Sequence, residues 1–131
     1  IYNAEVMNPL LARYAWHYSH ELDIESMVEE SRSLVGRHDF TVFTVTGCDA
    51  TDHVRTLTDV SLEEQGDLIR IFFTGEGFLR YQVRTMVSAL VEVNRGRNKT
   101  VSISELIVRG NGALIGPPAR ARGLTLMKVE Y

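Results

Sequence analysis

The segment 78–94 constrains the fold of this chain most, because its apolar residues recur with the period of an α-helix. Five of them fall on one side when each residue turns by about 100°: Leu79, Val83, Met86, Val87 and Leu90. A helix with one apolar stripe must bury that stripe against another element. The preceding residues, 68–74, have the composition of a β-strand, which Gly75 and Gly77 break. The order of strand, glycine turn and helix predicts a helix packed on a sheet.

A second strand is expected directly upstream of the first. Residues 54–62 alternate imperfectly between apolar and polar side chains, and Gln65, Gly66 and Asp67 form a turn signal before 68–74. Two extended segments separated by such a turn predict a β-hairpin with a short loop.

Two more helices have recognisable ends. Residues 22–36 are predicted as a helix, with Asp23 as a good N-cap and Gly36 as a good stop. A short helix is expected after Ser102, because Glu105 stands three residues further on and completes a capping box.

Extended chain is expected in two other places, 40–46 and 124–131. Together these elements predict an α+β fold: a mostly antiparallel sheet with helices packed on one face. The length of 131 residues fits one domain, 1–131, with a hydrophobic core.

The composition excludes several classes of protein. Cys48 is the only cysteine, so neither an internal disulfide nor a multi-cysteine zinc site can form. No apolar run approaches the roughly 20 residues that span a bilayer, and residues 1–10 do not have the pattern of a signal peptide. We therefore expect a cytoplasmic protein without a membrane partner. The chain starts without Met, in what resembles the middle of a domain, which suggests a fragment.

The charges are distributed unevenly along the chain. Residues 1–69 hold 4 Lys or Arg and 13 Asp or Glu, whereas residues 70–131 hold 10 and 4. Such asymmetry is found in proteins that present a basic side to a polyanion. It also arises when two solvated faces simply differ, and charge alone does not separate these alternatives.

Arg80 and Arg84 lie four residues apart, hence on the same face of the predicted helix. Like charges at this spacing repel unless an anion lies between them. Arg84 falls between Val87 and Val91 at the border of the apolar stripe, where a guanidinium is partly desolvated. It then needs a carboxylate or phosphate partner, or its side chain extends to solvent.

Three basic residues, Arg95, Arg97 and Lys99, follow the end of the same helix. Arg95 can compensate the helix dipole. Arg120 and Arg122 extend this cluster, and the dipole explains the extended cluster less well. With the aromatic side chain of Tyr81 nearby, the cluster is also suited to an RNA backbone.

Other chemistries find little support in the sequence. His17 and His20 have no Cys or carboxylate at zinc spacing, so we expect no metal site. Cys48 lies beside Asp49, which disfavours a reactive thiolate. No serine stands in a Gly-x-Ser-x-Gly elbow.

Several segments, in order along the chain, resemble one known family. They are YAWH at 14–17, LDIESM at 22–27, GRHDFTVF at 36–43, GEGFLRYQVRTMV at 75–87, LVEVNRGR at 90–97 and GLTLMKVEY at 123–131. These segments are similar to the signatures of the bacterial tRNA pseudouridine synthase A family, such as GxGFLxxMVRxMVG for the fourth. Gln82 and Ser88 depart from that signature, which usually has Met and Gly there.

The resemblance implies an activity. Members of this family isomerise uridine to pseudouridine in the anticodon stem-loop, at positions 38 to 40 of the tRNA, without a metal or an organic cofactor. They flip the target base out of its stack and use a nucleophilic aspartate in a GRTDAGVHA motif. They act as homodimers that bind tRNA across both subunits.

The resemblance also implies roles for particular residues. Arg84 matches the arginine that pairs with the catalytic aspartate, and Leu124 matches an apolar residue that packs on the target uridine. Leu124 can also be an ordinary strand core residue, and the two roles are compatible. We expect RNA contacts from the residues around and after the long helix: Arg80, Tyr81, Arg95, Arg97 and Lys99.

The sequence 1–131 contains no Gly-Arg-Thr-Asp segment. We therefore expect the catalytic aspartate in an N-terminal half of the same protein, and we expect this C-terminal part alone to be inactive. The alternative is a module that binds RNA or dimerises without performing chemistry.

Overall fold

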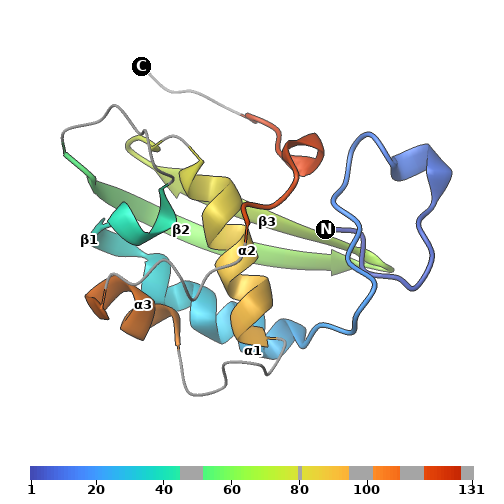
Figure 1. Cartoon of the computed structure of the whole chain (residues 1–131), viewed down its shortest axis with the longest axis horizontal. Helices are drawn as coiled ribbons and strands as arrows, with labels where there is room; N and C mark the ends of the chain where they lie inside the picture. Colours follow the sequence, from blue (N-terminus) through green and yellow to red (C-terminus); the bar gives the residue numbers. More distant parts are fainter. Residues whose placement is uncertain (45–51, 80, 95–101, 110–116, 128–131) are drawn as a thin grey trace.

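A computed structural model of the chain describes residues 1–44, 52–79, 81–94, 102–109 and 117–127. Its main elements are α1 (Ile24–Ser31), β1 (Gly36–Asp39), β2 (Val54–Gln65), β3 (Leu68–Gly75), α2 (Gln82–Asn94) and α3 (Ile103–Arg109). The strands form an antiparallel sheet in the order β1-β2-β3, and the helices lie on one face of it (Figure 1). The predicted α+β class is confirmed.

The predicted hairpin is present as β2 and β3. Gly66 adopts a φ of 59° in the two-residue loop that joins them, a backbone conformation that glycine reaches without steric cost. The strands pair from Leu57 opposite Gly75 to Gln65 opposite Leu68, with an irregularity after Leu57. This hairpin forms most of the sheet against which the helices pack.

Helix α1 begins where the sequence predicts. The Asp23 side chain accepts a hydrogen bond from the Ser26 amide at 3.3 Å and so satisfies one of the free amides of the first turn. The α-helix ends at Ser31, and a 3-10 helix (η2, Arg32–Leu34) continues it. Gly36 then starts β1 with a φ of 113°, so it ends the helical segment as predicted.

The prediction of extended chain over 40–46 is wrong for its described part. Residues Thr41–Phe43 form a 3-10 helix (η3) instead. This turn brings Phe40 and Phe43 together in the core, with ring centroids 6.0 Å apart and both side chains fully buried. Burial of two aromatic rings outweighs the weak strand preference of the threonines.

The long helix is present but begins four residues later than predicted, at Gln82. Tyr81 has a φ of 64°, which no helical residue can adopt. The buried Gln82 side chain accepts a hydrogen bond from the Leu79 amide at 2.8 Å. Met86 and Leu90 are fully buried, as the apolar stripe predicts.

The short helix after Ser102 is confirmed as α3. The Ser102 hydroxyl accepts a hydrogen bond from the Glu105 amide at 3.3 Å, as half of the predicted capping box. Ile103 and Leu106 bury their side chains against the same core. A carboxylate oxygen of Glu30 accepts from the Ile103 amide at 2.9 Å, which joins α3 to α1.

The predicted final strand is wrong over its described residues, 124–127. They belong to no strand, and Leu126 and Met127 are largely exposed. A strand needs a paired neighbour for its backbone groups, and the described residues provide none here. Residues 128–131 lie outside the described part of the chain.

The N-terminal residues lie along the outer edge of β3. The Ile69 amide donates to the Ile1 carbonyl at 2.7 Å, and the Asn3 amide donates to the Asp67 carbonyl at 2.6 Å. Tyr2 bridges His17 on one side and Leu68 on the other. Among the described helices, none is long and apolar enough to cross a membrane.

The close packing at the end of β3 requires a residue without a Cβ atom at position 75, which is Gly75. A Cβ atom there would lie 2.9 Å from the Thr56 carbonyl oxygen and 2.9 Å from Leu57 Cδ2, both closer than real contacts allow. We expect Gly75→Ala to lower the free energy of unfolding by about 2 kcal/mol, measured by urea denaturation.

Gly77→Ala is the matched control. Its added Cβ would meet only the Arg55 side chain, at 4.0 Å, which is an ordinary contact. The free energy of unfolding should change by less than about 0.5 kcal/mol. Equal losses for the two variants would contradict the steric explanation.

Candidate functional site

Arg84 lies in the first turns of α2, where the C-terminal segment 117–127 passes beside the helix (Figure 1). Its Nε atom donates a hydrogen bond to the Ala119 carbonyl at 2.7 Å, and the Ala119 amide donates to the Arg84 carbonyl at 3.1 Å. The two bonds run in opposite directions between the same two residues. They hold the C-terminal segment against the helix. They also fix the position of the Nε end of the Arg84 guanidinium.

Tyr81 lies under the same guanidinium. The Arg84 Cζ atom is 4.6 Å from the centroid of the Tyr81 ring, which is the geometry of a cation–π contact. Tyr81 holds its ring there with a φ of 64°, a left-handed conformation that costs a non-glycine residue about 1–2 kcal/mol. Strained backbone of this kind must be compensated by surrounding contacts.

Among the residues that the structure describes, no carboxylate lies within 4.0 Å of the Arg84 guanidinium. The ion pair found among these residues joins Arg70 and Glu63 at 3.7 Å. The Arg84 side chain is only partly exposed. Its two Nη groups therefore have capacity for a ligand that these residues do not supply. That an aspartate from elsewhere occupies them stays a prediction.

The side of α2 next to Arg84 is polar but buried. Thr85 and Ser88 are at least nine-tenths buried, although the period of the apolar residues places them away from the sheet. The Thr85 hydroxyl oxygen has no hydrogen-bond partner within the described chain. A buried hydroxyl without a partner costs about 1–3 kcal/mol.

Leu124 is half exposed, at 50%, and lies outside any strand. The interpretation that it is a strand core residue is therefore wrong. It follows a 3-10 helix (η5, Ala121–Gly123) that is held to the N-terminal region, because Arg122 Nη1 donates to the Ala12 carbonyl at 3.2 Å. Contact between Leu124 and a target base stays a prediction.

Four of the residues predicted to bind RNA lie outside the part of the chain that the structure describes: Arg80, Arg95, Arg97 and Lys99. Of the predicted RNA-contacting residues, only Tyr81 is placed, against Arg84. The structure thus brings together Arg84 and Tyr81, with Ala119 as an additional contact that the sequence did not indicate.

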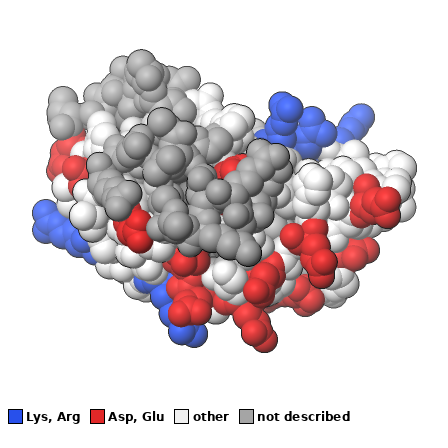
Figure 2. Space-filling model, turned by 60° about the horizontal axis from the view of Figure 1, so that its bottom comes forward, with Lys and Arg blue, Asp and Glu red and all other residues white. Residues whose placement is uncertain are grey.

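Acidic side chains gather on the described part of one face of the molecule. Figure 2 shows it with red side chains gathered along one half and few blue ones at the margins. α1 lies at this end of the molecule, and its exposed side chains include Glu25 and Glu29. These described acidic side chains repel a polyanion that approaches them.

A second network surrounds η3. The Asp39 carboxylate accepts from both the hydroxyl and the amide of Thr41, and the Thr41 hydroxyl lies 2.9 Å from His53 Nδ1. The bonds from the Thr41 hydroxyl and then its amide hold the pKa of the Asp39 carboxyl below its usual range. These bonds hold the turn that leads from β1 into the 3-10 helix, and they are exposed, so the network is explained by a structural role.

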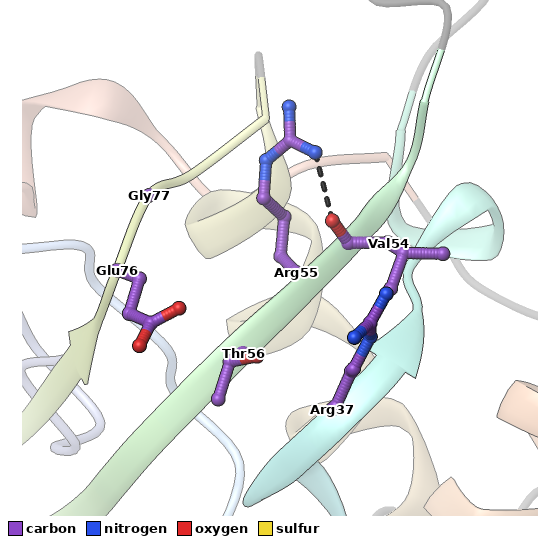
Figure 3. Close-up of a pocket in the computed structure, with 6 residues that line it drawn as sticks. All are labelled: Arg37, Val54, Arg55, Thr56, Glu76 and Gly77. Carbon is purple, nitrogen blue, oxygen red and sulfur yellow. Dashed lines mark hydrogen bonds between the residues drawn. The ribbon is translucent and has the colours of Figure 1, made fainter.

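A hollow of about 330 Å³ lies beside the turn between β3 and α2 (Figure 3). Two arginines from neighbouring strands, Arg37 and Arg55, line it. The sequence did not single them out, because residues far apart in the chain meet only once β1 pairs with β2.

Comparisons with known proteins agree on one family. The profile of the family described as tRNA pseudouridine synthase matches residues 31–131. Relatives named tRNA pseudouridine synthase A include those of Syntrophotalea carbinolica, 39% identical over 131 residues, and Acetivibrio thermocellus, 38% identical over 131 residues. These alignments cover all of this chain and 52% and 54% of the relatives. The chain spans about half the length of the curated relatives it matches.

Thr85→Val should stabilise the fold, because valine has the same shape and removes the buried hydroxyl that has no partner. We expect the free energy of unfolding to rise by about 1 kcal/mol in urea denaturation. Thr58→Val is the control: its exposed hydroxyl donates to the Thr74 carbonyl at 3.1 Å, so no gain is expected. A loss of stability in Thr85→Val would show that the hydroxyl has a partner.

Proposed function

The chain belongs to the tRNA pseudouridine synthase A family, and we propose that the protein containing it isomerises uridine to pseudouridine in tRNA. The family match over 31–131 supports this activity, and the placement of Arg84 is the structural observation that supports it most directly. The reaction breaks the C1′–N1 bond of the nucleotide and forms a C1′–C5 bond. The hydrogen on C5 leaves as a proton and N1 gains a proton, so the product is an isomer of the substrate.

In this proposal Arg84 binds the carboxylate of the nucleophilic aspartate, which the N-terminal half of the protein contributes. A guanidinium presents a planar fork of donors that matches a carboxylate. It also lowers the pKa of a neighbouring carboxyl and keeps it ionised at neutral pH, as a nucleophile requires.

The contacts of Arg84 suit such a role. The Nε bond to the Ala119 carbonyl and the stacking on Tyr81 restrict the guanidinium before any ligand arrives. Donors that are already oriented lose little entropy when they bind, and they stabilise charge without reorganisation. Neither contact neutralises the positive charge, which therefore remains for a carboxylate.

The finer parts of the proposal concern the substrate. We propose uridines 38 to 40 of the anticodon stem-loop as targets and tRNA phosphates as partners of the predicted basic residues. Leu124 is half exposed, and an exposed apolar side chain can pack on a flipped base. We also propose that the full-length protein is a homodimer and that it acts in the cytoplasm.

The second candidate is a module that binds RNA or dimerises without chemistry. It is favoured by the exposed apolar side chains of the C-terminal segment, Leu124, Leu126 and Met127. Exposed apolar residues of this kind occur at interfaces as well as at catalytic clefts. Turnover assays separate the two candidates.

Arg84→Gln in the full-length protein should abolish most pseudouridine formation. Loss of a partly buried charge pair costs several kcal/mol, so we expect kcat to fall by about 100-fold or more. Arg84→Lys keeps the charge but loses the fork, and it should retain more activity than Arg84→Gln. Tritium release from C5-labelled tRNA measures the rate.

Arg70→Gln is the control for net charge, because the side chain of Arg70 is half exposed and, within the described part of the chain, forms an ion pair with Glu63 at the surface. Its kcat should stay near that of the wild type. Thermal melting of each variant separates loss of chemistry from loss of folding. Normal turnover by folded Arg84→Gln would show that this arginine is only structural.

The chain 1–131 alone should produce no pseudouridine, since the nucleophile is proposed to come from other residues. Labelled tRNA is incubated with an excess of the purified chain, and pseudouridine is quantified after digestion to nucleosides. Addition of the N-terminal half should restore some turnover. Clear turnover by 1–131 alone would overturn the assignment of the nucleophile.

A further inference from the structure

The hollow beside the β3–α2 turn is built by three elements. Its lining consists of Arg37 from β1, Val54, Arg55 and Thr56 from β2, and Glu76 and Gly77 from the turn. Gly75 allows the turn to approach β2 closely, and the Glu76 amide donates to the Thr56 carbonyl at 3.1 Å. This bond holds the turn beside β2, and the hollow lies between them (Figure 3).

Backbone carbonyls accept hydrogen bonds from one of the two Nη groups of Arg55. Its Nη1 atom donates to the Asp52 carbonyl at 2.9 Å and to the Val54 carbonyl at 2.8 Å, which accounts for both Nη1 hydrogens. The Nε and Nη2 groups receive no acceptor from the described residues. They form one edge of the planar group, and that edge is the fork that binds two oxygens of one anion.

Arg37 adds a second positive charge to the same hollow. Its side chain is exposed, and no hydrogen bond or ion pair involves it within the described chain. Among the described residues, Glu76 is the carboxylate that lines the hollow. It lies more than 4.0 Å from both guanidinium groups, so neither arginine is neutralised by it.

We propose that this hollow binds a phosphodiester group of an RNA backbone, with the Nε/Nη2 edge of Arg55 on the phosphate oxygens and Arg37 as the second cation. The inference rests on the proposed function, which supplies RNA as the polyanion. A guanidinium held by backbone carbonyls is oriented before it binds, which favours a phosphate over a mobile counterion. Glu76 weakens this binding and limits it to a moderate affinity.

The test measures the Kd of the full-length protein for tRNA over a range of salt concentrations. Arg55→Gln should raise Kd roughly tenfold and Arg37→Gln roughly threefold, because each removes a charge from a phosphate contact. The slope of log Kd against log salt should fall by about 0.7–0.9 in Arg55→Gln. Glu76→Gln should lower Kd by roughly twofold to threefold, since it removes a repulsive charge.

Arg70→Gln is the matched control, because it removes one positive charge on β3 outside the hollow and should leave Kd unchanged. Unchanged Kd in both Arg37→Gln and Glu76→Gln would overturn the proposal, even if Arg55→Gln failed to fold. A second experiment measures the binding of inorganic pyrophosphate to the wild-type protein and to the variants. Pyrophosphate binding that depends on Arg55, with no effect of the variants on tRNA, would also overturn it.

Pseudouridine formation by the wild-type protein is measured in the same preparation. Normal turnover with unaltered Kd values in the variants contradicts the phosphate site and leaves the proposed function intact. Tight, Arg55-dependent tRNA binding without any turnover contradicts the proposed function and supports the site.

Discussion

The pair of hydrogen bonds between Arg84 and Ala119 is the interaction on which the rest of the candidate site depends. One bond joins the side chain of Arg84 to the Ala119 carbonyl, and the other joins the Ala119 amide to the Arg84 carbonyl. Two bonds in opposite directions fix both the separation and the orientation of the segments. They place residues separated by 35 positions in the chain at one end of α2.

Burial of α2 explains why this position is rigid. Met86 and Leu90 belong to the same hydrophobic core as Leu57 of β2 and Ile69 of β3. The polar residues Thr85 and Ser88 of the helix are buried as well. A helix covered on both sides cannot turn about its axis without opening the core. The partly exposed guanidinium of Arg84 therefore projects from a fixed frame. Positioning of this kind is what a group that orients a nucleophile requires.

Much of the fold could be predicted from local signals. The two-residue turn at Gly66 and the caps at Asp23 and Ser102 act over a few residues, so the sequence alone reveals them. The 3-10 helix at Thr41–Phe43 was missed because it depends on burial of two rings that other elements cover. The late start of α2 depends on the unusual backbone of Tyr81.

The site shows the same division between local and distant causes. Arg84 was singled out from its place at the border of an apolar stripe, which is a property of one helix, and its role as a site residue stays a prediction. Its contact with Ala119 was not predictable, since it joins residues far apart in the chain. The hollow at Arg37 and Arg55 was missed for the same reason, because strand pairing creates it. Helix periodicity reports which residues share a face, but not what covers them.

The central claim is that Arg84 is held in place by backbone and aromatic contacts while its charge serves a carboxylate from another part of the protein. A crystal structure of the full-length protein with tRNA tests this most directly. The account predicts an aspartate carboxylate from outside 1–131 within about 3 Å of the Arg84 Nη atoms, as in a charge-assisted hydrogen bond. A carboxylate from within 1–131 in that place, or a guanidinium turned to bulk solvent, would contradict it.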